Sequence, residues 1–414
     1  MKRIDYKMTR RVTISCVFVT LLMSITLFVV LPGILNAQSD PLLDQKVKKA
    51  ILAEEWTKVV DVLGPDSNLT SLPVARLIKG HACLALNRNN ESLCLFLSVT
   101  SEGDLKKWKD WTQEFAKKNP KSAIACYFEG DAFARLEQWD SALVALDKGL
   151  ELDSNHALIL NARGVTHVAK GEWDSAYVYL TKATVANDSF ADAHASLGAM
   201  WIHRRTGAKG ALERFSQALK VSPNFALALN GRGCAQFALG HWDEAKMDFE
   251  EAGKRADCLD LTNINLLGLN KAKVELMSIQ VDELVEDTAG MSVERRTHLG
   301  NIRNDIGLTK SQISSIEGAQ WRIHNWWKPI WHGVSGIPWV GGLGRGMVDK
   351  LNNRTSINEK TLDRFYSSTG CGVDLEKIRG AYIDRGNWPV VTWVGLVYYV
   401  KPVEFSSIKG SEKK

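Results

Sequence analysis

The sequence predicts a mainly α-helical protein, in which antiparallel helix hairpins stack into a solenoid and a small α+β domain follows at the C-terminus. Two observations lead to this prediction. Glycines recur about every 34 residues in the middle of the chain, and a tryptophan- and glycine-rich composition begins near residue 320. The content of 45% hydrophobic and 24% charged residues is ordinary for a folded protein and excludes a disordered chain.

The internal repeat covers about residues 123–257. Gly130, Gly164 and Gly198 are 34 residues apart, and Gly233 follows 35 residues later. A period of this length is typical of two-helix units, each of which leaves an apolar face that the next unit must cover. The same spacing relates apolar residues in the second half of the units: Trp139 and Trp173, Ala142 and Ala176, Leu146 and Leu180, then Ala211 and Ala245, and Phe215 and Phe249.

The residue types predict how each hairpin closes. The glycine near the middle of the first helix is expected to face the alanine of the second helix, so that the two backbones approach closely. Gly171 and Gly240 stand where the first helix ends and are expected to adopt the left-handed conformation. The tryptophan that follows each of them supplies an apolar contact across the hairpin. Four larger residues are expected to face the next unit: Leu146, Leu180, Phe215 and Phe249.

These residues resemble the tetratricopeptide repeat family, clearly over residues 123–257 and more loosely over about 44–290. The resemblance implies a right-handed solenoid whose first helices line a groove that binds a protein or peptide segment. Asn161 and Asn230 are the preferred clamping residues, because an amide both donates and accepts hydrogen bonds. Local hydrogen bonds on a helix surface are the alternative for both. The groove positions implied for this chain are Tyr127, Asp131, Arg135, Asn161, Val165, His203, Asn230 and Phe237.

Further helices are expected on both sides of the four units. Residues 38–122 are predicted to hold degenerate repeat-like helices, including a hairpin from Pro73 to Phe96 and a helix that ends before Asn119 and Pro120. Residues 258–290 are predicted to cap the last unit's apolar face, because leucine, valine and methionine recur there at helical spacing. Residues 291–319 are predicted to form a helical linker.

Residues 1–37 are predicted to be a signal peptide or an N-terminal membrane anchor. Five basic residues precede residue 12, and residues 12–36 carry no charge. Cleavage after Ala37 and retention as an anchor both remain open, since the apolar segment is about long enough to span a bilayer. In either case the body of the protein is expected outside the cytoplasm, secreted or periplasmic.

Charge and cysteine content exclude some function classes. The net charge of +5 comes mostly from residues 1–37, so the remainder is nearly neutral and offers no argument for nucleic-acid binding. The cysteines form no Cys-x-x-Cys pair, and no metal or cofactor site is predicted. They are interpreted as buried small residues, with a disulfide between Cys83 and Cys94 as an open possibility.

The region 320–414 is predicted to be a separate Trp/Gly-rich α+β domain. Ser356 and Glu359 form a capping box that is expected to open a helix ending near Gly370. A second helix is expected over 374–383 and a strand over 390–400. A winged-helix DNA-binding domain is disfavoured by the export signal. Four tryptophans are candidates for a membrane surface, with the core of the small domain as the alternative: Trp326, Trp327, Trp331 and Trp339.

The predicted function is an extracytoplasmic scaffold or adaptor that binds a protein or peptide segment in the repeat groove. In the alternative, the solenoid targets a C-terminal hydrolase or toxin-like domain to an envelope component. The residues that would serve such an enzyme are Cys371 with His324 or His332. No family resemblance supports this chemistry, so no catalytic residue is assigned.

Overall fold

The computed structural model describes residues 41–64, 72–99, 101–203, 207–255, 261–286, 290–331 and 339–369. The chain divides into two compact units, Met1–Leu69 and Thr70–Lys414. The first unit contributes one short hairpin, made of α2 (Pro41–Leu52) and α3 (Trp56–Val62). This hairpin lies within residues 38–122, the range predicted to hold degenerate repeat-like helices.

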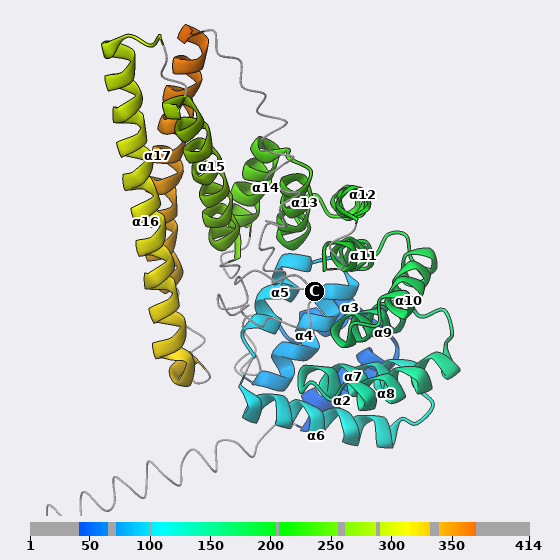
Figure 1. The fold of residues 1–414 in the computed structure, drawn as a ribbon. Coiled ribbons are helices and arrows are strands. Elements are labelled where there is room, and N and C mark those ends of the chain that lie inside the picture. The colour runs from blue at the N-terminus through cyan, green and yellow to red at the C-terminus, as the bar shows by residue number, and fades with distance from the viewer. Residues whose placement is uncertain are drawn as a thin grey trace, which may run out of the picture. The chain divides into compact units, whose positions relative to one another are not determined.

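The second unit begins with a hairpin and a single helix and continues with four helix pairs (Figure 1). The hairpin is α4 (Pro73–Ala85) and α5 (Asn89–Leu97), and the single helix is α6 (Glu102–Lys118). Both features were predicted, including the end of α6 before Pro120. The pairs are α7 (Ala123–Arg135) with α8 (Trp139–Leu152), α9 (Ala157–Lys170) with α10 (Trp173–Ala186), α11 (Ala191–His203) with α12 (Ala208–Val221), and α13 (Ala226–Ala238) with α14 (Trp242–Arg255).

Each helix pair packs on the next, so the second unit contains a helical solenoid. The turns follow one pattern, because the residue two positions before the second helix is left-handed in several hairpins. Gly171 has φ 76° and Gly240 has φ 84°, as predicted from their positions. Glu54, Asn87 and Glu137 adopt the same conformation at φ 53°, 55° and 59°. The shared turn shows that the hairpins α2–α3 and α4–α5 are built as repeat units.

The glycines of the repeat permit close packing, but their partners differ from the expectation. A Cβ atom on Gly164 would lie 2.6 Å from Leu180 Cγ, and one on Gly130 would lie 2.7 Å from Leu146 Cγ. Leu146 and Leu180 of the second helices therefore pack against the glycine of their own repeat. The sequence had predicted that these residues face the next repeat. Phe215 does both, since it covers Gly198 of its own repeat and Gly231 of the next.

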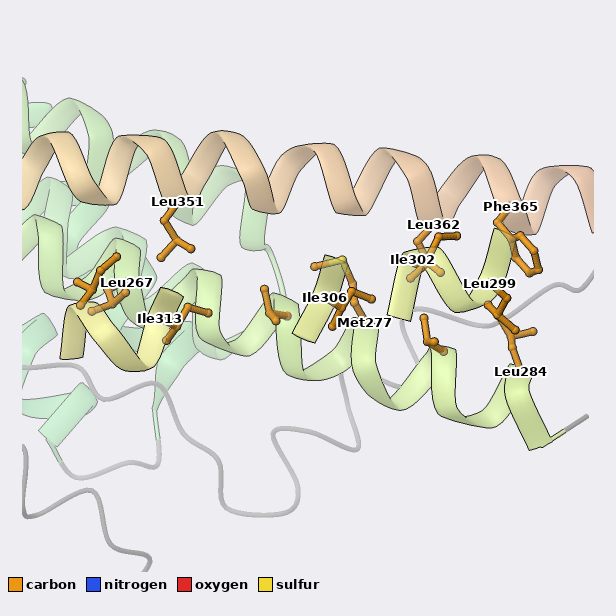
Figure 2. Packing of buried hydrophobic residues seen from close by; sticks show 13 residues of the cluster. Leu267, Met277, Leu284, Leu299, Ile302, Ile306, Ile313, Leu351, Leu362 and Phe365 are labelled. Atoms are coloured by element: carbon orange, nitrogen blue, oxygen red, sulfur yellow. The ribbon is translucent and has the colours of Figure 1, made fainter. Parts of the chain in front are cut away.

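Three long helices follow the solenoid: α15 (Leu261–Glu286), α16 (Val293–Trp331) and α17 (Trp339–Thr369). They pack against one another around a row of leucine, isoleucine, valine and methionine side chains, which Figure 2 shows between the helices. The buried residues recur at alternating intervals of three and four. This is the heptad spacing of helices that pack along a seam. On α16 they are Leu299, Ile302, Ile306, Ile313 and Ile316.

Polar pairs interrupt this seam and tie the three helices together. Asn270 of α15 donates to Asn352 of α17, and Asn358 of α17 donates 2.9 Å to Thr309 of α16. The ammonium group of Lys273, a residue 6% exposed, lies 3.1 Å from the Asp243 carboxylate and 3.1 Å from the Glu359 carboxylate. Such buried polar partners fix the register of packed helices.

Two expectations for this region need correction. Ser356 does not open a helix, because α17 begins at Trp339 and Glu359 reaches Lys273 instead of its own helix terminus. Upstream of the capping-box residues, Leu351 already belongs to the apolar seam and Val348 is buried against the last repeat, so the helix continues through this position. The expected boundary at residue 320 falls inside α16, which runs without interruption from the linker into the tryptophan-rich segment.

Helix α15 caps the solenoid, as predicted. Leu266, Leu269 and Leu276 of α15 form one buried cluster with the apolar residues of the last repeat, and Val348 of α17 joins it. The members from the last repeat are Cys234, Phe237, Trp242, Ala245 and Phe249. The apolar face that a terminal repeat would expose to water is thereby covered.

The cysteines behave mostly as buried apolar residues. Cys83, Cys126 and Cys234 are free and buried, and burial raises the pKa of the Cys83 thiol to about 12. Cys94 is disulfide-bonded, and because Cys83 is free the suggested Cys83–Cys94 bridge is wrong. The predicted leader over 1–37, the helix over 374–383 and the strand over 390–400 lie outside the described residues. Within the described part of the chain, no helix is long and apolar enough to cross a membrane.

Candidate binding surface

The predicted groove residues lie on α7, α9, α11 and α13, the first helices of the four pairs, which together form what we call the first-helix face. The structure describes the side chains of all of them except His203. Each has little or no exposed surface: Tyr127 and Asn161 0%, Asp131 and Val165 1%, Asn230 0%, Phe237 3%, and the Arg135 side chain 5%. A peptide would reach these side chains only after their present neighbours moved, and their role in binding stays a prediction.

Asp131 of α7 holds three helices together through one carboxylate oxygen. Its Oδ2 lies 3.1 Å from Nε2 of His81 on α4, 2.9 Å from Nε1 of Trp108 on α6, and 2.8 Å from Nε of Arg135 on α7. His81 Nδ1 lies 3.0 Å from the Tyr127 hydroxyl. The groove positions of α7 are therefore filled by α4 and α6, which anchor to α7 by these hydrogen bonds.

The charges of this cluster follow from its burial. Burial lowers the pKa of His81, and although Asp131 opposes this effect the imidazole stays below its ordinary value. Burial alone would raise the pKa of Asp131, but Arg135 and His81 hold it well below the usual range. A neutral His81 beside an ionised Asp131 carries its proton on Nε2 and accepts from Tyr127 on Nδ1. Both ring nitrogens then have a matching partner.

The two asparagines chosen as clamps bond to helices that follow their own helix pairs. Asn161 Nδ2 of α9 donates 2.9 Å to Asp192 Oδ2 of α11, and Asn230 Oδ1 of α13 accepts 2.7 Å from Asn265 Nδ2 of α15. Equivalent positions two repeats apart thus make equivalent contacts with the following helix. In this structure Asn161 bonds to the next repeat and Asn230 bonds to the capping helix α15. Both side chains are buried, whereas the alternative placed them on a helix surface.

Asp192 is a buried carboxyl group with little to stabilise a charge. It is 1% exposed, and burial raises its pKa to about 7, against the opposing hydrogen bond from Asn161. It lies in the first turn of α11, one residue after Ala191. The repeat interface between α9 and α11 therefore contains a group whose charge changes near neutral pH.

A second pair of asparagines, which sequence reasoning missed, binds backbone groups of the solenoid. Asn87 Nδ2 donates 2.7 Å to the carbonyl of Ser189, and its Oδ1 accepts 3.0 Å from the amide of Ala191. Three residues later, Asn90 Nδ2 donates 2.7 Å to the carbonyl of Asn224, and its Oδ1 accepts 2.8 Å from the amide of Ala226.

The two bonded loops are equivalent, because Ser189 and Ala191 are 35 residues before Asn224 and Ala226. Each loop leads into a first helix, α11 or α13, and each presents one carbonyl and one amide to a carboxamide group. Helix α5 also contacts α13. The sequence feature that could have indicated this site is the run Asn87-Arg-Asn-Asn90 at the turn of the α4–α5 hairpin. The sequence does not indicate which backbone groups these asparagines bond to.

Several buried polar atoms around these contacts have no hydrogen-bond partner in the described part of the chain. On α5 they are both amide atoms of Asn89 and the hydroxyl of Ser92, residues that are 3% and 0% exposed. On the first helices they are Asn161 Oδ1, Ser196 Oγ and Asn230 Nδ2. An unsatisfied buried polar group costs about 1–3 kcal/mol, so each of these atoms reduces the free energy that stabilises the packing of its helix.

The other site predictions fall where side chains are not described. Trp326, Trp327 and Trp331 belong to the last turns of α16, and Trp339 is the first residue of α17. His324 lies in α16, whereas His332 and Cys371 lie outside the described residues. In the part of the chain that the structure covers, no group of three or more His, Cys, Asp or Glu residues could hold a metal ion.

Comparison with known proteins gives likeness to solved structures alone. No family model matches the chain, and no curated protein matches it. Its helical part is similar to MamA from Desulfovibrio magneticus RS-1 at 19% identity, over 45% of this chain and 95% of MamA, with a TM-score of 0.31. At such values the likeness concerns the helical fold and says nothing of a partner.

Two further solved structures are similar at the same low level. YrrB, described as a TPR protein with an unusual peptide-binding site, has 16% identity over 48% of this chain and 91% of its own, with a TM-score of 0.29. A thermophilic TPR protein of Thermus thermophilus has 19% identity over 44% of this chain and 91% of its own, with a TM-score of 0.34.

The Asp131 cluster predicts a large effect for a small substitution. Asp131→Asn should lower the free energy of unfolding by about 3 kcal/mol, because it removes the carboxylate charge that lies 2.8 Å from the buried Arg135 guanidinium. Urea denaturation measures the change. Asp140→Asn is the matched control, since the Asp140 side chain is 91% exposed, and it should change stability by less than about 0.5 kcal/mol. Equal effects of the two substitutions would contradict the anchoring role.

Asp192 predicts a pH dependence of stability. Because its pKa is raised to about 7, the folded protein binds a proton that the unfolded chain loses near pH 4, and this contribution to stability declines as pH rises from about 4 to 7. Asp192→Asn should remove the decline. As pH rises from about 4 to 7, the free energy of unfolding of Asp192→Asn should increase relative to that of wild type. The increase is at most about 1.4 kcal/mol per pH unit.

Denaturation curves at pH 4.5, 6 and 8 test this dependence, with Asp140→Asn again as the control. A difference between Asp192→Asn and wild type that stays constant across the three pH values would show that Asp192 is ionised throughout.

Proposed function

We propose that the protein is a scaffold that binds a protein segment on its first-helix face. The observation that carries the proposal is that this face already holds a helical hairpin of its own chain. Asn87 and Asn90 bond to backbone carbonyl and amide groups of two equivalent loops, and backbone groups of this kind are common to every protein ligand. A surface that binds one helical segment in this way has the chemistry to bind another.

The location of the scaffold is part of the same proposal. The basic N-terminal residues followed by 25 uncharged residues support export or membrane anchoring of the body. The long helices α16 and α17 are the second contact surface of the proposed adaptor. They carry Trp326, Trp327 and Trp331 at the end of α16 and Trp339 at the start of α17, and these tryptophans are candidates for a membrane surface. Protein ligands are favoured over nucleic acid, because most of the net positive charge lies in the first eleven residues and the remainder of the chain is nearly neutral.

A crosslinking experiment with the full chain tests the proposed surface. Ala169 is exposed on the first helix α9 and Val144 is 70% exposed on the second helix α8. A photo-reactive amino acid introduced at Ala169 should crosslink to a partner protein in the native cells, whereas the same residue at Val144 should not. Adducts at position 144 alone, or at neither position, would overturn the assignment of the first-helix face.

A further inference from the structure

Asp192 and Asn161 bond to each other in the interior of the contact between α9 and α11. Asp192 is 1% exposed and Asn161 is 0% exposed, and Asn161 Nδ2 donates 2.9 Å to Asp192 Oδ2. The other polar atom of the amide, Asn161 Oδ1, is buried and has no donor among the residues that the structure describes. A buried acceptor without a donor destabilises the contact, so a proton donor is what this interface lacks.

No positive charge offsets a negative charge on Asp192. Helices α9, α10, α12 and α13 pack against α11, and no charged side chain contributes to the pKa shift of Asp192. The charged side chains of α9, α11, α13 and the α4–α5 turn have other partners: Arg163 with Asp147, His167 and Lys170 with Glu172, His194 with Asp188, Arg232 with Asp248, and Arg88 with Glu91. Those of α10 and α12 are exposed or half-buried: Asp174, Lys182, Lys209, Glu213, Arg214 and Lys220. An ionised Asp192 would be buried without a counter-charge, which favours the neutral acid.

The start of α11 offers little to a carboxylate at Asp192. A helix N-terminus favours a negative charge chiefly through its unbonded amide groups. Here the amide of Ala191 donates to Asn87 Oδ1, and the amide of Ala193 donates to the carbonyl of Phe190. The amides on both sides of Asp192 are thus already bonded, and Asn161 is the side chain that bonds to its carboxyl group.

We propose that Asp192 is a carboxylic acid in the folded protein and that it donates its proton to Asn161 Oδ1. Each side chain then donates one hydrogen bond to the other and accepts one in return, and we call this arrangement the acid–amide pair. A carboxyl group and a carboxamide group are both planar and carry two polar atoms side by side, so two parallel hydrogen bonds fit between them. The acid–amide pair joins the second helix pair to the third through two bonds instead of one.

A rise in pH weakens the acid–amide pair, which makes it a latch between the second and third helix pairs. When Asp192 ionises, its O–H bond breaks and the proton passes to water, so Asn161 Oδ1 loses its donor and a carboxylate stays buried. Because burial raises the pKa of Asp192 to about 7, the latch is closed in acidic solution and weakened above neutral pH. This response needs no partner and goes beyond the proposed function.

Infrared spectra of the full chain test whether the acid is present. At pH 6 ordinary Asp and Glu side chains are ionised, so the difference spectrum between wild type and Asp192→Asn should contain the carbonyl stretching band of one protonated carboxyl group. The band should disappear with a midpoint near pH 7. Asp140→Asn, which alters a side chain that is 91% exposed, is the control and should keep the band. Absence of the band from wild type at pH 6 would overturn the inference.

Two further variants test the pairing itself. In Asn161→Asp/Asp192→Asn the acid and the amide trade places, so the pair forms again and the infrared band at pH 6 should return. Asp192→Asn supplies Asn161 with both a donor and an acceptor, whereas Asp192→Leu supplies neither. The amides of α9 and α11 should therefore exchange at least about tenfold faster in Asp192→Leu than in Asp192→Asn. Equal exchange in these two variants, or a folded exchanged variant without the band, would contradict the acid–amide pair.

Hydrogen exchange at pH 6 and pH 8 tests the latch. After correction for intrinsic exchange rates, the α9 and α11 amides of wild type should be about tenfold less protected at pH 8 than at pH 6, because a group with a pKa of about 7 loses its proton between these values. Protection in Asp192→Asn should be equal at the two pH values. Equal protection in wild type at both pH values, or a pH effect that persists in Asp192→Asn, would overturn the latch.

Discussion

The hydrogen bonds to Asp131 Oδ2 determine how the N-terminal part of the second unit packs. One oxygen receives His81 from α4, Trp108 from α6 and Arg135 from its own helix, and all four side chains are buried or nearly so. A buried carboxylate is tolerable only because a guanidinium and two neutral donors surround it. The α4–α5 hairpin and α6 are thereby anchored on the first repeat.

This anchoring changes what the first-helix face can offer. In a regular array of repeats, the positions of Tyr127 and Asp131 would face a groove, but here α4 and α6 cover them. Farther along, Asn161 and Asn230 bond to the next helix, and the tip of α4–α5 reaches the loops before α11 and α13. The proposed surface for a partner is thus already bonded to its own chain.

The repeat could be predicted from the sequence because its signals are local. The 34-residue spacing identified the helix pairs, and the glycines at 171 and 240 identified the turns, since a left-handed residue is needed wherever the chain reverses there. The capping role of α15 also followed from its apolar spacing. The continuous course of α16 and α17 was missed because glycine and a capping box suggested breaks, although the heptad positions from Leu299 to Ile316 continue through the linker.

The site was less predictable, because its contacts join residues far apart in the sequence. Asn87 and Ser189 are 102 residues apart, and Asn90 and Asn224 are 134 apart. No local sequence pattern predicts these hydrogen bonds, because they depend on how α6 connects the α4–α5 hairpin to the first repeat. The residues predicted to line the groove lie on the first helices of the four pairs, but their burial depends on distant segments of the chain. The binding role assigned to them therefore stays a prediction.

Native-state hydrogen exchange on the wild-type full chain tests the central claim most directly. If Asp131 joins α4, α6 and α7 into one cooperative unit, the slowest amides of the three helices should exchange with one common opening free energy, as expected for a shared unfolding event. Exchange of α4 and α6 through a much smaller opening free energy than that of α7 would contradict the account. The N-terminal helices would then be an independent attachment to the solenoid.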